Sequence, residues 1–168
     1  MEISFEINTE KGDSLVVSLL SSYDFIKEVV NHSGSAEIEI IDVSIIRKSG
    51  DGQISVIVLK EIASKISNVL ESSPNAILFY YCDSSDPIPG IRSSRSILCQ
   101  EYRDRLFNLM FARFVGNENP GWRDYRIEAT IKGEPQFVHL IYRLDSKDTV
   151  DAIGREVLQT FSDIELQK

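Results

Sequence analysis

The sequence predicts an α+β fold in a single domain, residues 1–168: a mostly antiparallel β-sheet with three main helices packed against it. Several segments alternate apolar and polar residues, which is the period of a half-buried strand, and short glycine-containing turns join them in consecutive pairs. Three other segments repeat apolar residues at helical spacing. The chain is 42% hydrophobic and 26% charged, as is typical of globular domains, and no repeat or long linker divides it.

The chain begins with a predicted β-hairpin. Residues 2–8 alternate, residues 11–13 supply a turn, and residues 14–20 form the returning strand. Residues 23–31 have apolar side chains at helical spacing, but two adjacent valines lower the helix propensity. We interpret this stretch as a short helix, with a strand as the alternative.

The middle of the chain predicts a strand, a helix and a second strand. Residues 37–48 are β-branched and alternate, and a change of phase at Ile41 and Asp42 predicts a β-bulge there. Residues 56–71 carry an apolar helical stripe that ends before Pro74. The run AILFYYC, residues 76–82, is almost continuously apolar. Such a run is typical of a strand covered on both faces, so we expect it inside the sheet.

A helix, a hairpin and a closing helix complete the predicted fold. After an irregular loop over residues 84–95, apolar side chains at helical spacing predict a helix over 97–115. A hairpin follows, with strands at 123–131 and 136–143, and a closing amphipathic helix covers 150–161.

The charge balance and the hydropathy restrict the partners of this protein. The net charge is −8, whereas a domain that binds duplex nucleic acid usually carries a basic excess, so we do not expect nucleic acid as the main partner. No apolar run approaches the ~20 residues that cross a bilayer. The first residues are acidic and alternating, unlike a secretory signal. We therefore expect a cytoplasmic protein with no membrane segment.

The cysteines and histidines do not predict a metal site. A zinc site would need Cys82, Cys99, His32 and His139 together, and the chain has no CxxC pair. We interpret the cysteines as reduced thiols that pack as small apolar side chains. A nucleophilic Cys82 with His139 as its base has no local support, and we expect His139 to be half-buried or exposed in its strand. No cofactor is predicted.

The junction between the apolar strand and the following helix is the best candidate site. Loops at the carboxyl end of a central strand commonly form ligand crevices, and guanidinium groups bind phosphates and carboxylates. We therefore expect an anionic ligand or a protein partner at this junction. The alternative is that the aspartates pair with the arginines and only hold the loop in place. The candidate residues are Asp83, Asp86, Arg92, Arg95, Arg103 and Arg105.

Trp122, the only tryptophan, follows the polar stretch 116–121 and lies beside Arg123 and Arg126. A tryptophan between arginines can be an interaction hot spot, so we add it to the binding residues. The alternative is that its ring closes the edge of the core.

Residues 75–111 resemble a family of uncharacterised Bacteroidetes proteins. Their pattern is an apolar strand that ends in Cys-Asp, a turn containing an aspartate, and a helix with spaced arginines and an aromatic residue. The loop here is longer than in that family and contains Pro87 and Pro89. The resemblance implies a bacterial origin and a fold layout, but no chemistry. The matching positions are Cys82, Asp83, Asp86, Arg103, Arg105, Leu106, Phe107 and Phe111.

The sequence thus favours a non-catalytic cytoplasmic bacterial binding protein that uses the arginine-rich face from strand to helix. One alternative is a metal-dependent enzyme acting on phosphate esters or nucleic acid, with Asp83 and Asp86 as metal ligands. Another is a component of a toxin–antitoxin or defence system. The phosphate-binding motifs GxGxxG and GxxxxGK[ST] are absent. The oligomeric state is open, and a homodimer is one option.

Overall fold

A computed structural model of the protein describes residues 2–10, 12–21, 38–50, 54–82, 97–115 and 120–166. Six strands form one sheet in the order β1-β2-β3-β4-β6-β5. Only the pair β3–β4 is parallel, and the other neighbours are antiparallel, which confirms the predicted α+β architecture. The strands are β1 (Glu2–Asn8), β2 (Ser14–Ser21), β3 (Glu39–Ser49), β4 (Ala76–Cys82), β5 (Trp122–Ile131) and β6 (Glu134–Arg143).

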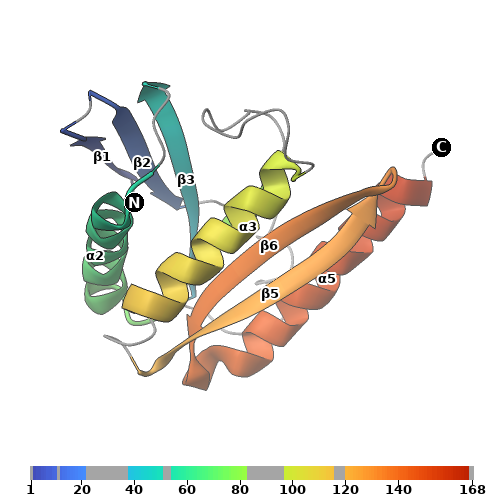
Figure 1. The fold of residues 1–168 in the computed structure, drawn as a ribbon. Coiled ribbons are helices and arrows are strands. Elements are labelled where there is room, and N and C mark those ends of the chain that lie inside the picture. The colour runs from blue at the N-terminus through green and yellow to red at the C-terminus, as the bar shows by residue number, and fades with distance from the viewer. Residues whose placement is uncertain are drawn as a thin grey trace.

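Helices cover both faces of the sheet (Figure 1). Helices α2 (Val56–Ser72) and α3 (Cys99–Met110) pack on one face, and α5 (Lys147–Leu166) packs on the other, behind β5 and β6. A π-helical turn, η1 (Phe111–Val115), continues α3, and a 3-10 turn, η2 (Leu144–Ser146), leads into α5. Within the described part of the chain, none of the helices has the length and apolarity needed to cross a membrane.

The interior position of the apolar run is confirmed. Strand β4 lies between β3, with which it is parallel, and β6, with which it is antiparallel. Its side chains alternate between the two cores: Leu78 and Tyr80 face α2 and α3, and Ile77 faces the α5 side. Both Ile77 and Leu78 are fully buried, which explains why the sequence of this strand shows no polar face.

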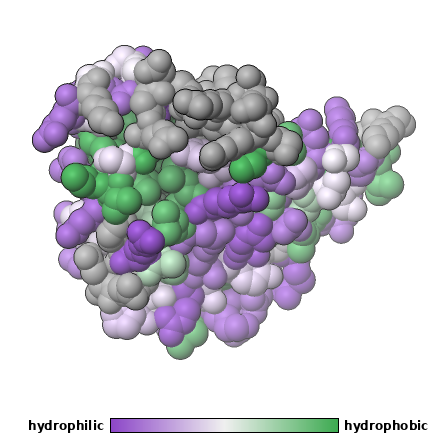
Figure 2. Space-filling view, viewed as in Figure 1, coloured by the Kyte–Doolittle hydropathy of each residue, from purple (hydrophilic) through white to green (hydrophobic). Residues whose placement is uncertain are grey.

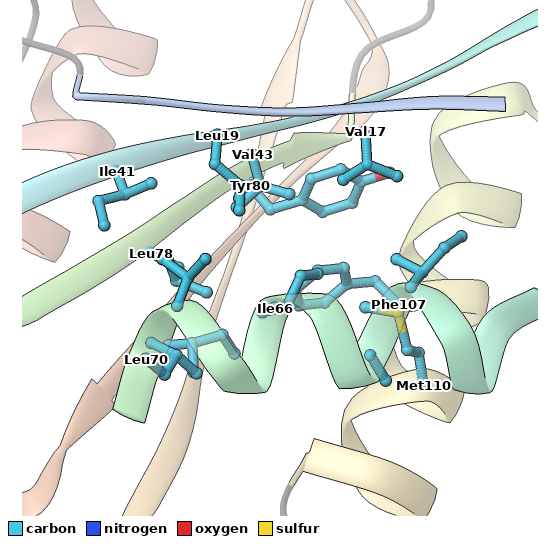
Figure 3. Packing of buried hydrophobic residues seen from close by; sticks show 14 of the residues in the cluster. Val17, Leu19, Ile41, Val43, Ile66, Leu70, Leu78, Tyr80, Phe107 and Met110 are labelled. Atoms are coloured by element: carbon cyan, nitrogen blue, oxygen red, sulfur yellow. The ribbon is translucent and has the colours of Figure 1, made fainter. Parts of the chain in front are cut away.

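The larger core lies between the sheet and the helices α2 and α3 (Figure 3). Burial of one large apolar side chain stabilises a fold by about 1.5–3 kcal/mol, so this layer supplies much of the driving force for folding. Labelled members from the sheet and both helices point toward one another in Figure 3: Val17, Leu19, Ile41, Val43, Ile66, Leu70, Leu78, Tyr80, Phe107 and Met110.

The predicted bulge at Ile41 and Asp42 is wrong, because β3 pairs there with β2 and β4 without a change of register. The alternation of apolar and polar residues is interrupted for another reason, because both faces of the strand are covered at its start. Ile40 is buried in the core on the α5 side, and Ile41 is buried in the core under α2. The register shift of this pair lies instead between Ser14 and Leu15 of β2.

The C-terminal elements are longer than predicted. Strand β6 begins at Glu134, so the hairpin turn consists of Lys132 and Gly133 alone, with φ of 53° and 83°. Two successive residues with positive φ form the tight turn that matches the twist of a hairpin. Helix α5 extends to Leu166, beyond the predicted end. The predicted short helix at 23–31 lies outside the described residues.

Candidate functional site

A cluster of charged side chains lies under α3, on the face of β5 and β6 that this helix covers. At its centre is His139 of β6, whose side chain is 0% exposed. Its Nδ1 atom lies 3.1 and 3.0 Å from the two carboxylate oxygens of Asp124 on β5. Its Nε2 atom lies 3.1 Å from Oδ1 of Asp104 on α3. We call Asp104, Asp124, Arg126 and His139 the His139 cluster.

Arg126 of β5 completes the cluster with a bidentate ion pair to Asp104. Its Nε donates to Oδ1 of Asp104 at 2.6 Å, and a terminal nitrogen donates to Oδ2 at 3.1 Å. The other terminal nitrogen donates to Glu128 at 2.9 Å. The hydrogen bonds to Asp104 are the main cause that raises the pKa of the Arg126 guanidinium, so this group stays charged at any physiological pH. Such bidentate pairs are the strongest kind of side-chain ion pair.

Aromatic rings close the cluster from inside the core. The ring of Phe107 lies 4.7 Å from the His139 ring, and the ring of Tyr80 stacks on Phe107 at 4.4 Å. The guanidinium of Arg126 lies over the ring of Phe137 at 4.7 Å. Three strands and one helix therefore meet at His139, and the cluster fastens α3 to the sheet.

The expectation that His139 is half-buried or exposed is wrong. Strand β6 lies inside the sheet between β4 and β5, and α3 covers this face of it. Both ring nitrogens face carboxylates at hydrogen-bonding distance, so neither is directed at Cys82. An imidazole with both nitrogens occupied and no solvent access is not placed to act as a general base.

Asp104 and Asp124 are not among the site residues predicted from the sequence, and Arg126 enters that prediction only as a neighbour of Trp122. One signal was present: Asp124, Arg126 and Glu128 alternate along a predicted strand and therefore lie on the same face. Asp104 had no such signal, because it meets His139 across 35 positions of sequence.

The predicted binding residues are placed only in part. On α3, Arg103 is half-buried and Arg105 is exposed. Four of the predicted residues lie outside the described part of the chain, so their proximity to α3 stays a prediction; they are Asp83, Asp86, Arg92 and Arg95. The strand that leads to the junction ends at Cys82, and the helix that follows it begins at Cys99.

The first turn of α3 holds two further polar side chains. Glu101 accepts a hydrogen bond from the backbone nitrogen of Leu98 at 3.2 Å and so occupies the end of the helix. Gln100 points inward and is 1% exposed. Its amide nitrogen is buried and has no hydrogen-bond partner among the described residues.

Trp122 is 6% exposed and belongs to the core cluster on the α2 and α3 side. It is the first residue of β5 and pairs with Arg143 of β6. This position agrees with the alternative interpretation of the sequence, in which the ring closes the edge of the core. A buried ring is not presented to a partner, so we no longer count Trp122 as a contact residue.

The surface on this side of the molecule is divided (Figure 2). Hydrophilic side chains gather over α3 and β5, whereas apolar side chains gather near α2 and between α2 and α3. Arg105 and Arg123 are among the exposed residues of α3 and β5. Arg123 donates to the backbone oxygens of Pro120 and Trp122, at 2.6 and 2.8 Å. Arg105 forms no ion pair with any described residue and is therefore the freer of these two cations.

Metal-binding arrangements are absent from the described ranges, which contain no group of three or more histidine, cysteine, aspartate or glutamate side chains suited to an ion. Both cysteines are free thiols, and Cys82 is buried as predicted. The metal-dependent alternative depends on Asp83 and Asp86, which are not described.

Comparison of the chain with protein-family models and with curated proteins finds no match. The resemblance of residues 75–111 to Bacteroidetes proteins therefore stays a prediction.

Proposed function

We propose that this protein is a non-catalytic bacterial binding protein of the cytoplasm, and that α3 presents its arginines to an anionic group on a partner protein. The observation that carries the proposal is the exposed Arg105, which has no ion pair in the described part of the structure. Guanidinium groups recognise carboxylates and phosphates through paired hydrogen bonds.

The contacts that hold α3 on the sheet favour a role of this helix in binding. The inner side of the helix is held by Phe107 and Met110, which are 3% and 2% exposed, and by the ion pair of Asp104 with Arg126. A side chain on a rigid element loses less conformational freedom when it binds. Arg105 is therefore displayed from a fixed position.

The chemistry of the described residues also favours binding over catalysis. The one histidine among them is buried, and the carboxylates beside it are already paired. Catalytic acids and bases must reach a substrate, whereas these groups satisfy one another. Their arrangement is that of a structural network.

A labelled oligoglutamate peptide tests the proposal, because it presents carboxylates on a protein-like chain. Fluorescence anisotropy at low salt should detect binding, and Arg105→Ala should weaken it about 1.4- to fivefold, since an exposed ion pair contributes about 0.2–1 kcal/mol. Arg155→Ala is the matched control, because Arg155 is an exposed arginine on α5, across the sheet. Absence of peptide binding, or equal losses in the two variants, would contradict the proposal.

A further inference from the structure

The hydrogen-bond partners of His139 indicate how many protons its ring carries. Oδ1 of Asp104 lies 3.1 Å from Nε2, and the two carboxylate oxygens of Asp124 lie 3.1 and 3.0 Å from Nδ1. An ionised carboxylate accepts hydrogen bonds and cannot donate them, whereas a neutral imidazole has only one N–H group. A neutral ring would therefore direct the lone pair of one nitrogen at a carboxylate within hydrogen-bonding distance.

The ion pair between Asp104 and Arg126 determines the first proton. Two nitrogens of Arg126 donate to the two oxygens of Asp104, at 2.6 and 3.1 Å. An arginine side chain stays charged in proteins and donates only, so Asp104 is the ionised acceptor of this pair. Nε2 of His139 must then carry a proton that it donates to Asp104.

The charge balance of the His139 cluster determines the second proton. Asp104 and Asp124 each carry a negative charge, and Arg126 carries one positive charge. The side chain of His139 is 0% exposed, and the two aspartate side chains are 8% and 13% exposed. A charge in such a place is costly unless an opposite charge pairs with it. A protonated Nδ1 donates to Asp124 and brings the sum of the four charges to zero.

The other described groups around the ring are aromatic or solvated. Phe107 of α3 and Tyr80 of β4 have their ring centres 4.7 and 6.5 Å from that of His139. Glu128 of β5 accepts a hydrogen bond from Arg126, but its side chain is 58% exposed to water. The two aspartates are therefore the acidic groups to which the charge of the ring responds.

We propose that His139 is held as a doubly protonated imidazolium at neutral pH, and that its second proton makes the connection between α3 and the sheet sensitive to pH. Loss of the proton from Nδ1 would direct a lone pair at the oxygens of Asp124. It would also remove the positive charge that attracts Asp104 of α3. This inference goes beyond the proposed function and does not depend on what α3 binds.

The pH dependence of unfolding tests the second proton. An unfolded histidine has a pKa of about 6.5, so above this pH the unfolded chain releases a proton that the native state keeps. The contribution of the imidazolium to stability is therefore complete below about pH 6.5 and is lost as the pH rises further. Urea denaturation at a series of pH values should show an unfolding equilibrium constant that rises by up to about tenfold per pH unit.

Asp124→Asn is the test variant. An asparagine amide can accept from an N–H group or donate to a lone pair, so His139 no longer needs its second proton. The dependence of unfolding on pH should become clearly weaker than in the wild type. Asp145→Asn is the matched control, because the Asp145 side chain is 74% exposed, and it should keep the dependence of the wild type. Equal pH dependence in the wild type and Asp124→Asn would overturn the proposal.

NMR of the isotope-labelled wild type tests the same proton without a variant. Both ring nitrogens of His139 should carry a proton at neutral pH. The methyl signal of Met110, a buried residue of α3, should shift as Nδ1 loses its proton at higher pH. A ring nitrogen without a proton at neutral pH would contradict the imidazolium. A Met110 signal that stays in place while His139 is deprotonated would contradict its connection to α3.

Discussion

At the scale of single residues, the His139 cluster shows how charges are kept inside this fold. Asp104 accepts from Arg126 and faces His139, and its side chain is 8% exposed. A buried charge is tolerated when it is paired, and removal of one partner leaves the others without compensation. The cluster is therefore a point at which one substitution affects several elements.

We expect Asp104→Ala to lower the free energy of unfolding by about 3–5 kcal/mol, the cost of breaking a buried ion pair from one side. Urea denaturation measures this change. Asp145→Ala is the control, because Asp145 faces Arg143 at 3.9 Å but its side chain is 74% exposed. The control should change stability by less than about 1 kcal/mol. Similar values for the two variants would show that the cluster does not fasten α3.

A second residue-scale prediction concerns Asp42 of β3, whose pKa is raised because burial penalises its charged form. The native state then holds this proton more tightly than the unfolded state does. The stabilising contribution of protonated Asp42 is present at acid pH and is lost as the pH rises through the native pKa. We expect Asp42→Asn to be more heat-stable than the wild type at neutral pH, with the difference disappearing below about pH 3.9. A difference that is independent of pH would contradict this assignment.

At the scale of elements, the features predicted correctly are those whose signal lies within one segment of the sequence. The run AILFYYC indicated an interior strand because burial on both faces removes every polar residue, and β4 is interior. The same rule explains why β3 has two adjacent apolar residues at the place where a bulge was predicted. Ile40 and Ile41 are buried on opposite faces of the strand, because both faces are covered there. The charge pairs were not predictable, because they join α3 to β5 and β6 across long sequence separations.

The turn after β3 gives a prediction about backbone conformation. Gly50 has φ of 89°, and a Cβ atom there would lie 1.8 Å from Oδ1 of Asp13, a buried residue that pairs with Arg47. Gly12 also has a positive φ, of 81°, but nothing lies within 4 Å of a Cβ at that position. Gly12→Ala should therefore cost only the strain of the left-handed conformation, about 1–2 kcal/mol, and Gly50→Ala clearly more. Denaturation of both variants measures the difference, and equal losses would contradict the close approach of Asp13.

The turn between β5 and β6 gives a prediction of a substitution that stabilises the fold. Lys132 has φ of 53°, a left-handed conformation that lysine adopts at a cost, and Gly133 follows it. Asn-Gly is the preferred pair for this turn. We expect Lys132→Asn to raise the free energy of unfolding by about 0.5–1 kcal/mol, since the strain of a left-handed residue falls. A loss of stability would show that the lysine side chain contributes an interaction of its own.

At the scale of the whole molecule, the fold places a rigid helix with an exposed arginine beside an interior strand. The edge strand β5 turns Asp124 and Arg126 toward α3, and inward-pointing charges are a common protection of sheet edges against pairing with another chain. This arrangement favours recognition through side chains of α3 over the addition of a strand at β5.

The guanidinium of Arg105 offers the most direct measurement. Its Nε–H signal is observable by NMR, and the signal of Arg155, which is also exposed but lies on α5 across the sheet, serves as the internal control. During titration with the oligoglutamate peptide, we expect the Arg105 signal to move saturably and the Arg155 signal to stay in place. If the Arg105 signal does not move, the proposed binding role of α3 is wrong.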